Sequence, residues 1–213
     1  MSGLPLESAD GGGRFPGFRA MSQVQHWDDA TTAVVVERLG LPVHIRFFTR
    51  AEEACANPLF DQLLHQRQEP RVPVAAMVDS RLAEQQFDGW HYEGMPRDDE
   101  AWRVSLGHLD EDAEAQHGTV FAELSWDEQA ALLHRIRELK DSLWHGLSAG
   151  RVWSLWTRYA CAAFYSHPWA WDEIGFSGPA YPRGYKNLGV DSREPYEVAD
   201  TGPTVDPVAK DSS

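Results

Sequence analysis

The sequence has few of the features that cross-link a chain or anchor it to a membrane. Its 213 residues include only two cysteines, Cys55 and Cys161, which are too few for a disulfide scaffold or for a four-cysteine zinc site. The longest apolar run, Tyr159 to Tyr165, falls far short of the ~18 residues of a membrane-spanning helix. Basic residues are scarce, and 19 Lys+Arg against 33 Asp+Glu give a net charge of -14. This charge excludes binding to nucleic acid or anionic lipid through a general basic surface.

The motifs that hold redox cofactors are also missing. The sequence contains no G-x-G-x-x-G, because Gly175, Gly178 and Gly184 have the wrong spacing for a dinucleotide-binding turn. It has neither a phosphate-binding P-loop nor a C-x-x-C-H haem attachment site. We therefore expect no cofactor on this chain, and we expect any flavin or haem with which it works to be held by another chain.

The two ends of the sequence differ in composition from its middle. Residues 1–24 begin with a glycine-rich stretch that has no apolar signal core and no adjacent arginine pair, so we expect a flexible leader on a cytoplasmic chain, or on one carried out of the cytoplasm by a partner. Residues 191–213 are acidic and poor in large apolar groups, which predicts a flexible tail. Residues 25–190 are expected to form one helical domain.

Helix signals dominate that domain. Asp28 and Asp98 are suited to begin helices, and the pairs Thr49/Glu52 and Ser125/Glu128 have the spacing of capping boxes. The second helix is expected to kink or break at Asn57-Pro58, and the helix after Ser125 to continue through Leu139 and Leu143. The sequence therefore predicts an all-α fold, a single irregular helical bundle with a long aromatic, Gly/Pro-rich C-terminal loop.

The C-terminal third is unusually aromatic. Residues 150–165 predict a helix that is apolar on nearly every face, either central in the bundle or partly covered by another protein. The loop over 167–185 combines tryptophans and tyrosines with an arginine, the residue types that anchor protein interfaces. It either folds back over its own bundle or binds a partner. The candidate partner-binding residues are Trp153, Trp156, His167, Pro168, Trp169, Trp171, Ile174, Phe176, Tyr181, Arg183 and Tyr185.

Catalytic and metal-binding chemistry has weaker support. The histidines are scattered and form no H-E-x-x-H motif, and no G-x-S-x-G elbow is present. Acidic runs such as 98–100 and 110–112 are typical of solvated helix surfaces. Cys55 and Cys161 are interpreted as buried or idle thiols. We therefore expect no catalytic and no metal-ligating residue.

Residues 156–188 resemble the C-terminal signature of the gluconate 2-dehydrogenase subunit 3 family. The similar features are an aromatic helix, the F-Y-S-H-P step at 164–168, the Trp-containing segment 169–171 and the I-G-F-S-G-P stretch at 174–179. Upstream, the segments 47–49, 78–82 and 121–124, with Gln129, are similar too, so that the resemblance covers roughly residues 45–190.

The resemblance implies a helical small subunit without catalysis of its own. Such a subunit would fold, stabilise or help export an FAD-dependent catalytic subunit of the glucose–methanol–choline (GMC) class, which oxidises a sugar, sugar acid or alcohol. A multi-haem cytochrome c subunit often accompanies this pair. Two alternatives stay open, namely a stand-alone helical enzyme and a binding or chaperone module unrelated to redox chemistry.

Overall fold

The structure, a computed structural model, describes residues 15, 17–40, 44–187, 189–190 and 192–199. Most of the predicted leader and the end of the predicted tail lie outside these residues. The chain folds as two compact units, one of residues 40–167 and one that combines residues 1–39 with 168–213. We call the first the inner unit and the second the terminal unit. The boundaries expected from the sequence, with one domain over residues 25–190, stay a prediction.

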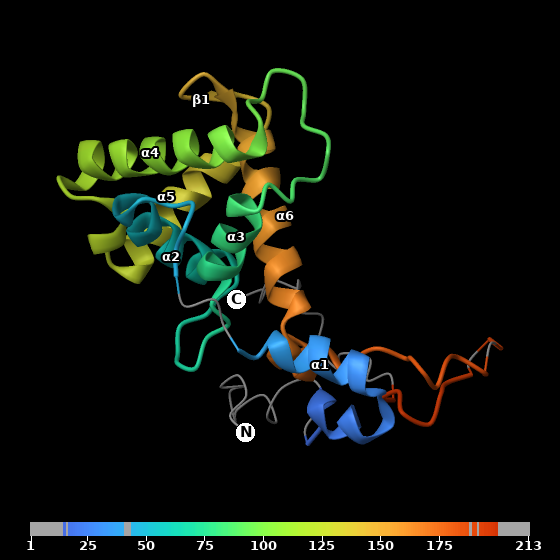
Figure 1. Cartoon of the computed structure of the whole chain (residues 1–213). Coiled ribbons are helices and arrows are strands. Elements are labelled where there is room, and N and C mark those ends of the chain that lie inside the picture. Colours follow the sequence, from blue (N-terminus) through green and yellow to red (C-terminus); the bar gives the residue numbers. More distant parts are fainter. Residues whose placement is uncertain (1–14, 16, 41–43, 188, 191, 200–213) are drawn as a thin grey trace. The chain divides into compact units, whose positions relative to one another are not determined.

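The inner unit is mostly helical, as predicted (Figure 1). A two-stranded antiparallel hairpin, which pairs Trp144 with Leu147, interrupts the helices. The elements in chain order are α2 (Arg50–Leu63), α3 (Val74–Ala83), α4 (Asp98–His117), the 3-10 helix η3 (Phe121–Glu123), α5 (Trp126–Glu138), β1 (Leu143–Trp144), β2 (Leu147–Ser148) and α6 (Ala149–Ser166).

Local sequence signals set several helix boundaries. Both predicted capping boxes are present: Thr49 with Glu52 begins α2, and Ser125 with Glu128 begins α5. In each box the hydroxyl and the carboxylate satisfy backbone N–H groups that the first helical turn leaves free. Of the kink or break predicted at Asn57-Pro58, the break is absent, since α2 continues through Pro58 to Leu63.

The predicted extension of α5 is wrong. The helix ends at Glu138, and Lys140 then adopts a left-handed φ of 50°, which no α-helix continues through. Leu143 is 69% exposed and belongs to β1. The apolar spacing that suggested a longer helix therefore ends at Ile136, the last of its leucine and isoleucine positions that the structure buries.

An aromatic cluster fills the centre of the inner unit. The Trp102 ring on α4 lies 5.3 Å from the Phe60 ring and 5.7 Å from the Tyr159 ring, measured between centroids. The indole N–H of Trp156 donates to the Ser105 hydroxyl at 3.0 Å. The apolar stripe of α6 is buried against this cluster, but Cys161 and Tyr165 near its C-terminal end are exposed. α6 is therefore not enclosed on all sides. Of the two thiols predicted to be buried or idle, Cys55 is buried and Cys161 is exposed, so burial does not account for Cys161.

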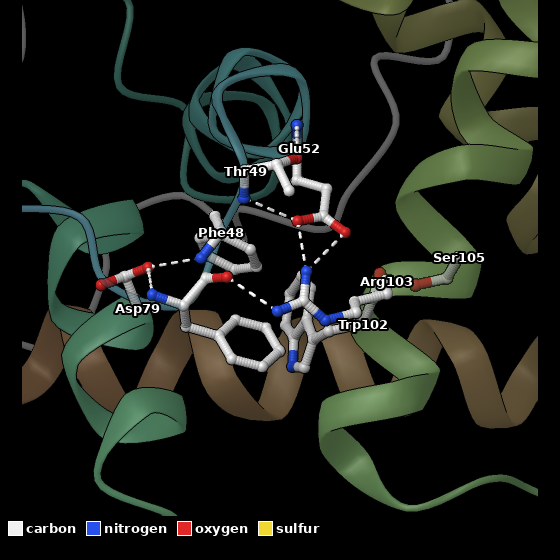
Figure 2. A network of polar contacts seen from close by, with 8 residues as sticks. Phe48, Thr49, Glu52, Asp79, Trp102, Arg103 and Ser105 are labelled. Carbon is white, nitrogen blue, oxygen red and sulfur yellow. Dashed lines mark hydrogen bonds and ion pairs between the residues drawn. The ribbon is translucent and has the colours of Figure 1, made fainter.

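A fully buried carboxylate joins α3 to the start of α2. The Asp79 side chain is 0% exposed and accepts backbone N–H groups from Arg46 at 2.7 Å, Phe47 at 2.8 Å and Phe48 at 2.7 Å. Arg103 closes the other side of this connection, donating to Glu52 and to the Phe47 carbonyl (Figure 2). Two of the segments that carry the family resemblance, 47–49 and 78–82, are thus held together by one side chain.

The terminal unit brings the two ends of the chain together. It contains the 3-10 helix η2 (Ala20–His26), α1 (Asp29–Glu37) and α7 (Pro168–Ile174), and α1 begins at the predicted cap, Asp28. Its core consists of Ala20, Trp27, Val35 and Trp171. Residues 168–174 were expected to be loop. They form a helix instead, because proline is well tolerated at the first helical position and no glycine interrupts the chain before Gly175.

Among the described residues, no helix combines the length and the apolar character that crossing a membrane requires.

A candidate partner-binding surface in the terminal unit

The C-terminal loop of the terminal unit starts from a fixed point. On α7 the Asp172 carboxylate, which is only 7% exposed, accepts the backbone N–H of Ala20 at 2.7 Å and the Arg19 guanidinium at 3.1 Å. These bonds attach α7 to η2. The chain that leaves α7 at residue 175 therefore begins from a helix whose position in the unit is set by buried polar contacts.

Two glycines shape the first turn of the loop. Gly178 has a φ of 76°, and a Cβ placed there would lie 2.3 Å from Cζ2 of Trp27. Gly175 has a φ of 68°, and its Cβ would lie 2.5 Å from a methyl carbon of Val198. Only glycine meets both the left-handed backbone and the close approach, which explains the glycine positions of the I-G-F-S-G-P segment.

Four of the predicted partner-binding side chains are exposed. Ile174 is 44% exposed, Phe176 40%, Tyr181 64% and Tyr185 54%. A hollow of about 410 Å³ lies beside them and is lined in part by Phe176 and Tyr185. All four lie at the end of α7 or in the loop that follows, and three of them are aromatic. We therefore call Ile174, Phe176, Tyr181 and Tyr185 together the exposed aromatic loop set.

Arg183 is held within the same loop. Its guanidinium lies 3.8 Å from the ring centre of Tyr196 and donates to the Gln23 side chain at 2.9 Å. A cation stacked on an aromatic face loses side-chain freedom before any partner arrives. The loop is therefore partly pre-ordered around Arg183.

The remaining predicted residues are wholly or partly covered. Trp156 is 0% exposed, His167 1% and Trp171 3%, and Pro168 is buried as well. Trp153 and Trp169 are half-buried. Trp156 and Trp171 thus support the cores of their own units, and a partner would meet the exposed aromatic loop set first.

Burial changes the chemistry of His167. Removal of the imidazole from water lowers its pKa from the ordinary 6.5 to about 4, because desolvation disfavours the charged form. The ring is therefore neutral at physiological pH, at the junction between α6 and α7.

One group of side chains was not anticipated from the sequence. The structure brings His108 and Glu111 of α4 together with His145 of the hairpin, although the histidines appear scattered along the chain. His108 and Glu111 have the i, i+3 spacing that places them on one helix face. No sequence signal connects them with His145, which comes from a separate element.

The family comparison agrees with the resemblance. The family model described as gluconate 2-dehydrogenase subunit 3 matches residues 50–178, which is more than half of the chain. The chain belongs to the gluconate 2-dehydrogenase subunit 3 family. No curated protein and no solved structure matches it significantly. The matched segment covers α2 to Gly178 and ends before Tyr181, Arg183 and Tyr185.

Proposed function

We propose that this member of the subunit 3 family is a non-catalytic accessory subunit. It would bind an FAD-dependent GMC-type subunit that oxidises a sugar, sugar acid or alcohol, and would stabilise or mature it. Membership in a family described as a dehydrogenase subunit supports this proposal. The sequence contains no dinucleotide-binding motif, so in this proposal the FAD is held by the partner, and a cytochrome c subunit would accept the electrons.

The observation that carries the proposal is the exposed aromatic loop set. Exposed large apolar side chains cost free energy in water, and they are typical of interaction sites when they form a patch; here four of them lie within residues 174–185. Tyrosine supplies much contact area with few rotatable bonds, and tyrosine and arginine are both enriched among the residues that dominate binding energy. Tyr181 and Tyr185 flank Arg183 in this sequence, so the loop combines these features within five residues.

Pre-ordering favours the same interpretation. The loop leaves a helix that Asp172 attaches to η2, and its first turn requires Gly178 against Trp27. A surface that is already ordered loses less conformational entropy on association, so more of the contact energy appears as affinity. The described contacts thus support a docking element rather than a linker.

The test is co-expression with a GMC-type flavoprotein subunit from the same organism. We expect a tagged chain to retain a flavin-containing partner through purification, and Tyr181→Ala with Tyr185→Ala to reduce the recovered flavoprotein by at least about tenfold, which corresponds to ~1.4 kcal/mol. Tyr92→Ala is the matched control, because Tyr92 is also exposed, at 40%, but lies in the inner unit.

Three results would contradict the proposal. Unchanged flavoprotein recovery with the double variant would show that the loop does not bind the flavoprotein. Substrate turnover by the isolated chain would favour a stand-alone enzyme, and stable association with a partner that holds no flavin would favour a module unrelated to redox chemistry.

A further inference from the structure

A His–carboxylate cluster in the inner unit lies outside the proposed partner surface. The Nδ1 atom of His108 is 2.9 Å from Oε2 of Glu111, and Nδ1 of His145 is 3.6 Å from the same oxygen. One potential ligand atom from each residue lies within 4.8 Å of the others. Three donor atoms at such separations can converge on a single ion after small side-chain movements.

The hairpin presents His145 to α4 through an uncommon backbone conformation. His145 has a φ of 47° and Gly146 a φ of 83°, so both central residues of the two-residue turn are left-handed, as a type I′ turn requires. A non-glycine residue with positive φ is uncommon. The backbone thus accepts an unfavourable conformation at the residue whose imidazole faces α4.

Asp112 orients the His145 ring. Its Oδ1 lies 2.8 Å from Nε2 of His145, and its Oδ2 accepts the indole N–H of Trp144 at 2.7 Å. A carboxylate can only accept, so Nε2 carries a proton, and in the neutral ring the lone pair is on Nδ1, the nitrogen that faces Glu111. A carboxylate that fixes the tautomer of a ligating histidine is the usual outer shell of a metal site.

We propose that His108, Glu111 and His145 bind one borderline divalent transition-metal ion of the zinc class, with Asp112 as the outer-shell carboxylate and water completing the coordination. Two imidazoles and one carboxylate suit Zn²⁺, Ni²⁺ or Cu²⁺, whereas Mg²⁺ and Ca²⁺ prefer oxygen ligands alone. Before the ion binds, the proton that His108 directs at Glu111 from Nδ1 must be exchanged through solvent to Nε2 of the same ring, so that the imidazole stays neutral and the Nδ1 lone pair bonds the metal.

The cluster has the freedom to close around an ion. The two imidazole rings are stacked 4.3 Å apart at 8°, so one ring must turn before both nitrogens point at one ion. Asp112 holds the His145 ring at 2.8 Å, so the groups that would turn are the His108 ring, whose side chain is 23% exposed, and the Glu111 side chain, which is 62% exposed. A bound ion would join the hairpin to α4, just before α6 begins at Ala149.

The site does not depend on the partner, so the isolated full-length chain is the test material. After removal of any polyhistidine tag and of metal by a chelator, titration with Zn²⁺ is followed by calorimetry. We expect one equivalent to bind, Mg²⁺ not to compete, and His108→Ala or His145→Ala to weaken Zn²⁺ binding by at least about tenfold, the lower end of the loss that outer-shell changes already cause. His117→Ala is the matched control, since His117 pairs with Glu128 at 3.5 Å elsewhere on the surface.

A spectroscopic measurement keeps the proposal falsifiable if a variant folds poorly. Co²⁺ added to the unaltered chain should shift and broaden the ring NMR signals of His108 and His145 before those of His117. Three results would each overturn the proposal. The first is that the chain binds no stoichiometric Zn²⁺, the second that Cys161→Ser abolishes binding while His145→Ala retains it, and the third that Co²⁺ first broadens the signals of other histidines. It is independent of the flavoprotein experiment, so either can fail while the other succeeds.

Discussion

Replacement of Asp79 by asparagine tests how the inner unit holds its first helix. One carboxylate oxygen of Asp79 accepts the N–H groups of Phe47 and Phe48, and the other accepts that of Arg46. Asparagine has one acceptor oxygen, so its NH₂ group must face one of these donors. The change keeps the size of the side chain and removes its charge and half of its accepting capacity.

The magnitude follows from the three bonds. A hydrogen bond to a charged group contributes about 1.5–3 kcal/mol and a neutral one about 0.5–1.5 kcal/mol. Loss of the Arg46 bond and weakening of the other two therefore predict a decrease of about 3–5 kcal/mol in the free energy of unfolding. Because whole domains are stable by only about 5–15 kcal/mol, this is a large fraction of the total.

Urea unfolding followed by circular dichroism measures the effect. We expect a lower midpoint with an unchanged slope, since the slope reports the surface exposed on unfolding. Asp141→Asn is the control, because Asp141 is exposed and its loss should change stability by less than ~0.5 kcal/mol. A decrease below ~1 kcal/mol for Asp79→Asn would show that these bonds do not hold the segment as the reasoning requires.

Two further changes probe the junction and the loop. The pKa of His167 is lowered to about 4, so as the pH falls the imidazole takes up a proton in the unfolded chain before it does so in the folded chain. The free energy of unfolding therefore has its full value from this group above about pH 6.5 and is about 2 kcal/mol lower at pH 5. His167→Gln should abolish that part of the pH dependence of urea unfolding, and an unaltered profile would contradict the burial argument. Gly178→Ala should destabilise the terminal unit by about 2–4 kcal/mol, through backbone strain and overlap of the new methyl group with Trp27. Gly184→Ala is the control: Gly184 has a similar φ of 69°, but a Cβ there would meet no atom within 4 Å, so the change should cost only about 1–2 kcal/mol. Equal thermal shifts for the two alanine variants would count against the close approach at Gly178.

The features predicted correctly are those encoded by neighbouring residues. A capping box needs only four residues, so Thr49 with Glu52 and Ser125 with Glu128 predict the starts of α2 and α5. The hairpin was missed because its turn is His-Gly instead of the more recognisable Asn-Gly or Asp-Gly. α7 was missed because its residues were grouped with the Gly- and Pro-rich residues that follow it, as one aromatic loop over 167–185.

Contacts between distant residues were beyond sequence reasoning. The Asp79 bonds connect residues 31 to 33 positions apart, and no local pattern distinguishes this aspartate from the many that lie on the surface. The same limit applies to His145, whose approach to His108 depends on where the hairpin packs. The sequence shows that these residue types are present, but not which of them lie close together in the folded chain.

The burial of the aromatic residues shows why composition alone cannot separate a core from an interface. Tryptophan loses the most apolar surface on burial and so is drawn inward, and Trp156 and Trp171 indeed lie within the two cores. Tyrosine keeps a hydroxyl that water can solvate, and Tyr181 and Tyr185 stay at the surface. Two of the tryptophans that first suggested an interface, Trp156 and Trp171, therefore account for stability, whereas the most exposed of the predicted side chains are the two tyrosines beyond Gly178. Since the family match ends at residue 178, family membership says nothing about these tyrosines, and only their exposure in the structure points to them.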